Sequence, residues 1–105
     1  DLARFGYALA EPGYLKKSTI DLFTTSQTTN DGKPTSNGIG FFNGTDDDGR
    51  KWFGHSGGSV GGTSKLMVFP EQDLVVVTLI NLSGADTDDL AMRIAEVILS
   101  GKSKR

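Results

Sequence analysis

The hydrophobic pattern of the first part of the chain predicts two helices and a loop. Apolar residues recur near the start at the three- and four-residue spacing of a helix, at Leu2, Phe5 and Leu9. We expect this helix to end at Pro12-Gly13 and a second, short helix to follow with Ser18 as its N-cap. The segment 24–36 is rich in Thr, Ser, Asn and Gly, which predicts a long loop whose degree of order the sequence leaves open.

Apolar runs in the middle of the chain predict four antiparallel strands. The strands are expected at 38–43, 50–56, 63–69 and 74–82. An Asp-Gly pair at 48–49 predicts a hairpin turn, and the glycine-rich run 57–62 is expected to break the second strand. The last strand is almost continuously apolar, which is typical of a strand buried on both faces.

The C-terminal stretch predicts the clearest helix. Asp86 or Thr87 is expected to cap it and Gly101 to end it. Its apolar face consists of Leu90, Ala91, Ile94, Ala95, Val97 and Ile98. The order of elements predicts an α+β fold, in which an antiparallel sheet of about four strands is flanked by N-terminal and C-terminal helices.

The composition narrows the classes of function. A chain of 105 residues suffices for one domain, and its net charge of -2 argues against a nucleic-acid-binding surface. No apolar run reaches the ~18 residues that indicate a membrane span. The absence of cysteine and the single histidine exclude disulfides, thiolate metal sites and any site that needs two histidines. We therefore expect no metal and no cofactor.

The only histidine lies in the segment that is richest in candidate chemistry. His55 and Ser56 are followed by Gly57 and Gly58, and glycines allow close backbone approach, so that exposed N–H groups can stabilise an oxyanion. A glycine-rich hairpin with an incidental histidine explains the same pattern. Because adjacent side chains of a strand point to opposite faces, a simple pair of Ser56 activated by His55 is not expected.

The segment His55-Ser56-Gly57-Gly58 resembles the third motif of the serine β-lactamase-like family. That family includes class C β-lactamases, D-alanyl-D-alanine peptidases and related esterases. Four further segments resemble the family in the right order over nearly the whole chain: 1–5 a late helix beginning DLARF, 20–27 a helix ending MTTPQ, 38–41 a YGLGW strand, and 67–77 a hairpin containing DPE. Asn37 and Phe41 depart from the pattern, since Tyr and Trp are usual at these places.

The resemblance implies acyl transfer through a serine ester. In the family, the serine of an S-x-x-K motif attacks, its lysine and the tyrosine of a Y-x-N motif move protons, and a K-T-G strand borders the substrate. Here His55, Ser56 and Gly57 stand in place of that Lys, Thr and Gly, which implies that they line the substrate cleft. Gly58 would offer one backbone N–H to the oxyanion hole.

The nucleophile motif is absent from these residues. No serine has a lysine three positions later, and neither Tyr7 nor Tyr14 has an asparagine two positions later. We therefore expect residues 1–105 to be a single domain, the C-terminal portion of a β-lactamase-like hydrolase, and to be inactive alone. The partners implied are the missing N-terminal half of the same protein and a small-molecule or peptide substrate.

Two other hypotheses stay open. The chain could be a non-catalytic ligand- or peptide-binding domain of the same ancestry, or an α/β sandwich whose likeness is accidental. The resemblance favours a periplasmic or secreted location and leaves a cytoplasmic one open. In the family, strands from the start of the chain pair with the last strand, 74–82. An isolated piece would expose this edge, which favours either a homodimer through it or a covering helix.

Overall fold

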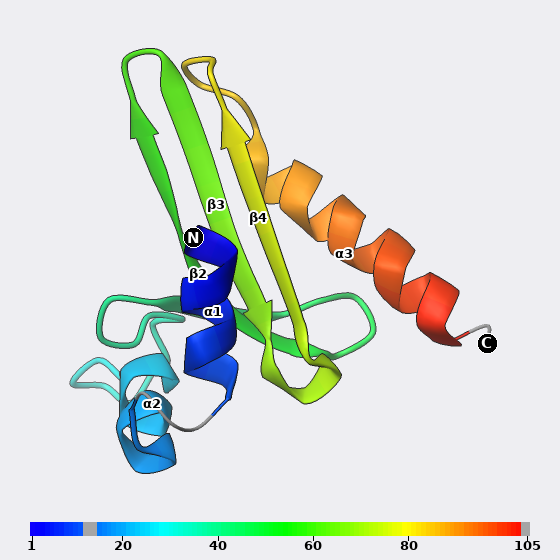
Figure 1. The fold of residues 1–105 in the computed structure, drawn as a ribbon. Helices are drawn as coiled ribbons and strands as arrows, with labels where there is room; N and C mark the ends of the chain where they lie inside the picture. The colour runs from blue at the N-terminus through cyan, green and yellow to red at the C-terminus, as the bar shows by residue number, and fades with distance from the viewer. Residues whose placement is uncertain (12–14, 104–105) are drawn as a thin grey trace.

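The computed structural model describes residues 1–11 and 15–103, which form one antiparallel sheet with helices on both faces (Figure 1). The helices are α1 (Leu2–Ala10), α2 (Lys17–Thr24) and α3 (Thr87–Ser103). The strands are β1 (Phe42–Thr45), β2 (Lys51–Ser59), β3 (Gly62–Phe69) and β4 (Leu74–Ile80), and the short 3-10 turn η1 (Pro70–Gln72) precedes β4. The predicted α+β class is confirmed.

The sheet is a meander in which each strand pairs with the next, in the order β1-β2-β3-β4. The hairpin of β2 and β3 ends with Ser59 opposite Gly62, so that Val60 and Gly61 form the turn. Gly61 has a φ of +85°, a conformation that favours glycine. The expectation that the run 57–62 breaks the strand was wrong, because pairing with β3 continues through these glycines to the tip of the hairpin.

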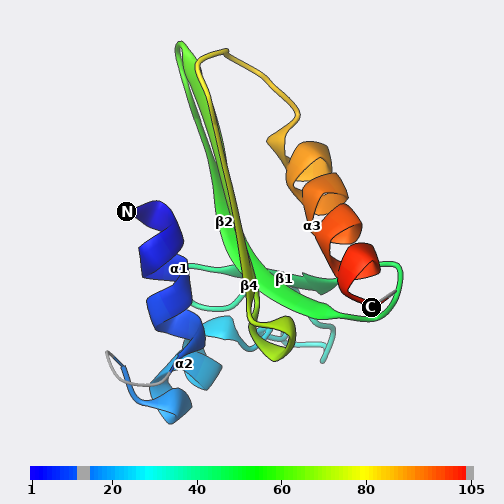
Figure 2. The ribbon, with the colours of Figure 1, turned by 45° about the vertical axis from the view of Figure 1, so that its right-hand side comes forward.

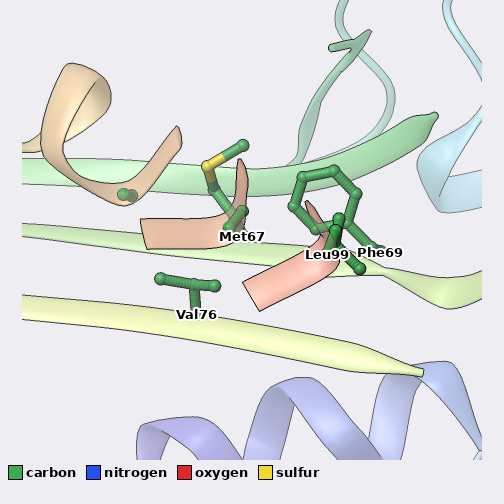
Figure 3. Close-up of a cluster of buried hydrophobic side chains, with 6 residues drawn as sticks. Met67, Phe69, Val76 and Leu99 are labelled. Atoms are coloured by element: carbon green, nitrogen blue, oxygen red, sulfur yellow. The ribbon is translucent and has the colours of Figure 1, made fainter. Parts of the chain in front are cut away.

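Two hydrophobic clusters hold the helices to the sheet, one on each face. The nearly edge-on view shows α1 and α3 on opposite sides of the sheet (Figure 2). The cluster beneath α3 consists of Met67, Phe69, Val76, Ala91, Ala95 and Leu99 (Figure 3). The cluster beneath α1 consists of Leu9, Phe53, Leu66 and Val68. Alternate residues of β3 therefore serve opposite faces, as the two-residue period of a strand requires.

Several predicted element ends were wrong. The first strand begins at Phe42 rather than 38, because the Gly38 N–H bonds to the Phe41 carbonyl and Gly40 adopts a φ of +79°, which makes a turn. The last helix continues through Gly101 to Ser103. Leu79 is exposed, so the last strand is not buried on both faces along its whole length.

The helix starts gave a mixed result. The predicted Asp86 cap is confirmed, because its Oδ1 accepts the Asp89 N–H at 3.1 Å. In α2 the N-cap is Lys16, and Ser18 lies inside the helix. The Pro12-Gly13 stop lies outside the described residues. Within the described part of the chain, no helix is both long and apolar enough to cross a membrane.

Candidate active-site wall

The outer edge of β2 is open beyond the point where β1 stops. β1 pairs with β2 only from Lys51 to Gly54, whereas β3 pairs with β2 from Phe53 to Ser59. In the part of the chain that the structure describes, no strand pairs with 55–59 on the outer side. Because backbone groups of alternate residues point to each side of a strand, this edge presents unpaired N–H and C=O groups.

His55 lies at the start of this open edge and is held in place by two contacts. Its ring stacks on the ring of Phe42, with centroids 4.5 Å apart and an interplanar angle of 17°. Its Nδ1 lies 2.6 Å from the Ser56 carbonyl oxygen. A carbonyl oxygen only accepts hydrogen bonds, so this contact assigns the proton to Nδ1. The other ring nitrogen, Nε2, is then the atom left for a ligand.

A groove of about 350 Å³ lies beside His55, between the start of α1, the 40–41 loop and the hairpin. Three of the predicted site residues line it, namely His55, Ser56 and Gly57. Their apolar neighbours in the groove are Leu2, Phe5 and Phe41. An apolar groove with one imidazole suits a small ligand that carries both an apolar group and a polar one. Gly58 lies outside this groove and lines an adjoining depression of about 510 Å³ at the hairpin tip, and Gly57 and Ser64 line both.

The side chains of His55 and Ser56 belong to opposite faces of the sheet. His55 is paired with Leu66 of the α1-side cluster, whereas Ser56 is paired with Lys65. This alternation agrees with the expectation that the two residues form no simple Ser–His pair.

Lys65 is a buried cation that the sequence did not single out. Only 5 % of its side chain is exposed, and its Nζ lies 2.7 Å from Asp88 Oδ1 and 5.1 Å from the centre of the Trp52 ring. The ion pair joins the first turn of α3 to β3, behind Ser56. If the turn had been placed at residues 60–61, counting back along the two strands would have predicted that Ser56 pairs with Lys65. The glycine-rich run 57–62 gave no sign of which two residues form the turn.

The acidic turn between β1 and β2 has a structural role. Asp46 Oδ1 accepts the N–H groups of Asp48 and Arg50, and its Oδ2 lies 3.0 Å from Arg50 Nη1. Burial by itself would raise the pKa of Asp46, but the Arg50 N–H and guanidinium and the Asp48 N–H outweigh it and lower that pKa. Among the described residues, no group of three or more His, Asp or Glu side chains could hold a metal ion.

Comparison with known proteins gives one family. The family described as Beta-lactamase matches residues 1–99, a range that includes the open edge of β2 and the groove. No curated protein and no solved structure matches the chain.

Proposed function

Because the chain belongs to the beta-lactamase family, we propose that it forms one wall of an acyl-serine hydrolase cleft whose nucleophile comes from a segment outside these 105 residues. The observation that carries this proposal is the open edge of β2 at 55–59, beside the groove that His55 lines. The substrate class proposed is a β-lactam, a D-alanyl peptide or an ester.

In the proposed cleft, the chain binds and polarises the substrate. His55, Ser56 and Gly57 line the cleft. In its imidazolium form His55 donates its Nε2–H to the carboxylate or carbonyl region of the substrate, while Nδ1–H is held by the Ser56 carbonyl. The backbone N–H of Gly58 donates to the oxyanion that forms during attack. An N–H that is already fixed in a strand needs no reorganisation at that moment, which is how such donors lower a barrier.

The reaction then needs a serine that these residues do not provide. Its Oγ would attack the substrate carbonyl carbon as its hydroxyl proton is removed. The tetrahedral oxyanion would then collapse to a serine ester, and that proton would pass to the leaving nitrogen or oxygen, which departs as an amine or an alcohol. Water would hydrolyse that ester and release the acid. Loss of a serine nucleophile costs on the order of 10⁶ in rate in a serine hydrolase, so the chain alone is proposed to be inactive.

A complementation assay tests the proposal through Gly58. Residues 1–105 are mixed with a separately produced protein segment, the one that the same gene encodes upstream of Asp1. The hydrolysis of a chromogenic β-lactam and of an ester by this mixture is then measured. Gly58→Pro removes the N–H and is expected to reduce hydrolysis by roughly 10²–10³-fold. A proline is tolerated on an open strand edge, and circular dichroism checks that the variant folds.

Gly58→Ala is the matched control. It keeps the N–H, and its Cβ would come no closer than 3.8 Å to Thr63 Cγ2, so near-wild-type hydrolysis is expected. Equal hydrolysis by a folded Gly58→Pro protein would contradict the role of the N–H. A mixture that hydrolyses neither substrate would refute the hydrolase proposal itself.

A non-catalytic peptide-binding role is the second candidate, and the same open edge favours it. An exposed strand edge can take up an extended peptide as an additional strand. An upstream coding sequence without S-x-x-K and Y-x-N motifs would favour this role. Binding of an extended peptide to the isolated chain, with shifted amide signals at 55–59, would support it further.

A further inference from the structure

The hairpin that carries the candidate site is rich in glycine and extends beyond the last paired residue of β4. Four of the six residues at 57–62 are glycine, which weakens a strand because it loses the most conformational freedom on folding and has no side chain to pack. Residues 57–61 are exposed, and β4 ends at Ile80, which pairs with Thr63. Contacts other than strand pairing are therefore needed to hold the tip in one place.

The loop that follows β4 supplies such contacts at the tip. Figures 1 and 2 both show this loop beside the end of the β2–β3 hairpin. The Gly61 N–H donates to Ser83 Oγ at 2.7 Å, and Thr63 Oγ1 donates to the Leu82 carbonyl oxygen at 2.8 Å. These two bonds tie the turn and the start of β3 to the loop where the β3–β4 pairing has ended.

The first turn of α3 holds the next two residues of β3. Thr87 Oγ1 donates to the Ser64 carbonyl oxygen at 3.3 Å, and Lys65 Nζ forms its ion pair with Asp88. Loss of the Asp88 charge would leave the buried ammonium of Lys65 without a counter-ion, which is costly. The ion pair is therefore a strong link between α3 and β3.

The anchored residues of β3 face the candidate site across the hairpin. The pairs are Lys65 with Ser56, Ser64 with Gly57, and Thr63 with Gly58. Because backbone hydrogen bonds join the two strands of a hairpin, a displacement of β3 at these positions displaces β2 with it. Contacts that fix 63–65 therefore also fix 56–58.

The direction of the Gly58 N–H depends on this pairing. Hydrogen-bonded and non-hydrogen-bonded pairs alternate along an antiparallel ladder, and a two-residue turn at 60–61 makes Ser59 and Gly57 the residues that bond to β3. Gly58 lies between them, so its N–H points to the open edge. An opening of the hairpin at Gly57 or Ser59 would release that N–H from its orientation.

We propose that the segment 82–88, which we name the hairpin clamp, positions the Gly58 N–H for the oxyanion. Ser83 and the Lys65–Asp88 pair are its positioning residues. The catalytic consequence rests on the proposed function, whereas the hold of the clamp on the hairpin does not.

Amide hydrogen exchange of residues 1–105, measured residue by residue by NMR, tests the hold on the hairpin. Ser83→Ala removes the acceptor of the Gly61 N–H, and exchange at Gly57 and Ser59 is expected to become roughly 2–10-fold faster. Exchange at Val68 in the core is expected to stay unchanged, because only the hairpin tip loses a contact. Ser83→Thr keeps the hydroxyl and is expected to restore the wild-type rates.

Asp88→Asn tests the other half of the clamp. It removes the counter-ion of Lys65 and is expected to accelerate exchange at Gly57, relative to Val68, by roughly 10-fold or more. Asp89→Asn is the matched control, because its carboxylate lies in the same helical turn, is 63 % exposed and pairs only with the exposed Arg93. This variant is expected to exchange like the wild type, and circular dichroism verifies that each variant folds.

Hydrolysis by the mixture with the upstream segment tests the catalytic consequence. Ser83→Ala is expected to lower kcat by roughly 2–10-fold and to leave KM unchanged, because the oxyanion that Gly58 binds exists only during the reaction. Ser83→Thr is expected to restore kcat. A loss of stability alone would not be reversed by one hydroxyl while KM stays constant.

The outcomes separate this inference from the proposed function. Equal exchange at Gly57 in the wild type and Ser83→Ala, or an equal acceleration at Val68, overturns the clamp. Faster exchange at Gly57 with an unchanged kcat overturns its positioning role. A mixture that hydrolyses neither substrate refutes the proposed function and the catalytic consequence with it, while the exchange rates still decide whether the clamp holds the hairpin.

Discussion

At the scale of single residues, the carboxylate of Asp46 organises the β1–β2 turn. Only 1 % of its side chain is exposed, and it accepts two backbone N–H groups while pairing with Arg50. Because its pKa is lowered in the folded chain, folding is favoured by the ionised form. This contribution is fully present above about pH 4, the ordinary pKa of aspartate, and is lost as the pH falls through the lowered folded-state pKa.

Asp46→Asn is therefore expected to destabilise the protein in a pH-dependent way. At pH 7 the free energy of unfolding should fall by about 1–2 kcal/mol, since the amide loses the charge-assisted bonds. The difference from wild type should shrink in acid, where the carboxylate itself is protonated. Urea denaturation at both pH values measures this. Asp47→Asn, at the exposed neighbouring residue, should change stability by less than about 0.5 kcal/mol. A loss at Asp46 that does not vary with pH would contradict the assignment.

The sequence indicated candidate site residues but not their surroundings. His55, Ser56 and Gly57, which the motif resemblance selects, line one groove, and their role in a site stays a prediction. The resemblance could not select Phe42, because the stacking on His55 depends on the β1–β2 pairing. Nor could it predict that Lys65 is buried, since an isolated lysine in a strand pattern usually lies at the surface.

At the scale of elements, β2 leaves no room for a side chain against β3 at Gly54. A Cβ at this position would lie 1.9 Å from the Leu66 carbonyl oxygen, which is backbone and cannot move aside without separating the strands. Only glycine fits there, and the next residue is His55. The close approach to β3 therefore holds the backbone of β2 immediately before His55, and the open edge begins there because β1 stops at its pairing with Gly54.

Gly54→Ala is expected to lower the free energy of unfolding by about 1–3 kcal/mol or more, because an added methyl group overpacks the hairpin. The same change at Gly58 meets only ordinary contact distances and should cost less than about 0.5 kcal/mol. Thermal and urea denaturation of the two variants compare these effects on one strand. Equal stability of the two variants would show that the strands are not constrained at Gly54.

The kinds of elements and their order followed from the sequence, whereas several ends did not. The three helices and the strands β2, β3 and β4 overlap the segments that the apolar periodicity indicated, whereas β1 shares only residues 42 and 43 with the strand expected at 38–43. The glycines at 57–58 remain in β2 because β3 supplies their backbone partners, and residues 38–41 turn instead of pairing with β2. Both outcomes depend on long-range pairing, which overrides the local preference of the residues concerned.

At the scale of the whole molecule, the described residues leave both outer edges of the sheet open along part of their length, and the two edges differ in composition. The β2 edge carries the candidate site, and the β4 edge is apolar and uncharged. The sequence predicted a sheet with flanking helices, but not that α1 and α3 would both lie over β3 and β4. That placement depends on the packing of the two clusters, which no local pattern encodes.

The central claim is that these residues provide a cleft wall without a nucleophile. Intact-mass spectrometry after incubation with a penicillin tests it most directly, with the chain alone and with the chain mixed with its upstream segment. We expect residues 1–105 to keep their mass of 11.2 kDa in both samples and the added penicillin mass to appear on the upstream segment. A penicillin-sized mass increase on the isolated chain would contradict the account.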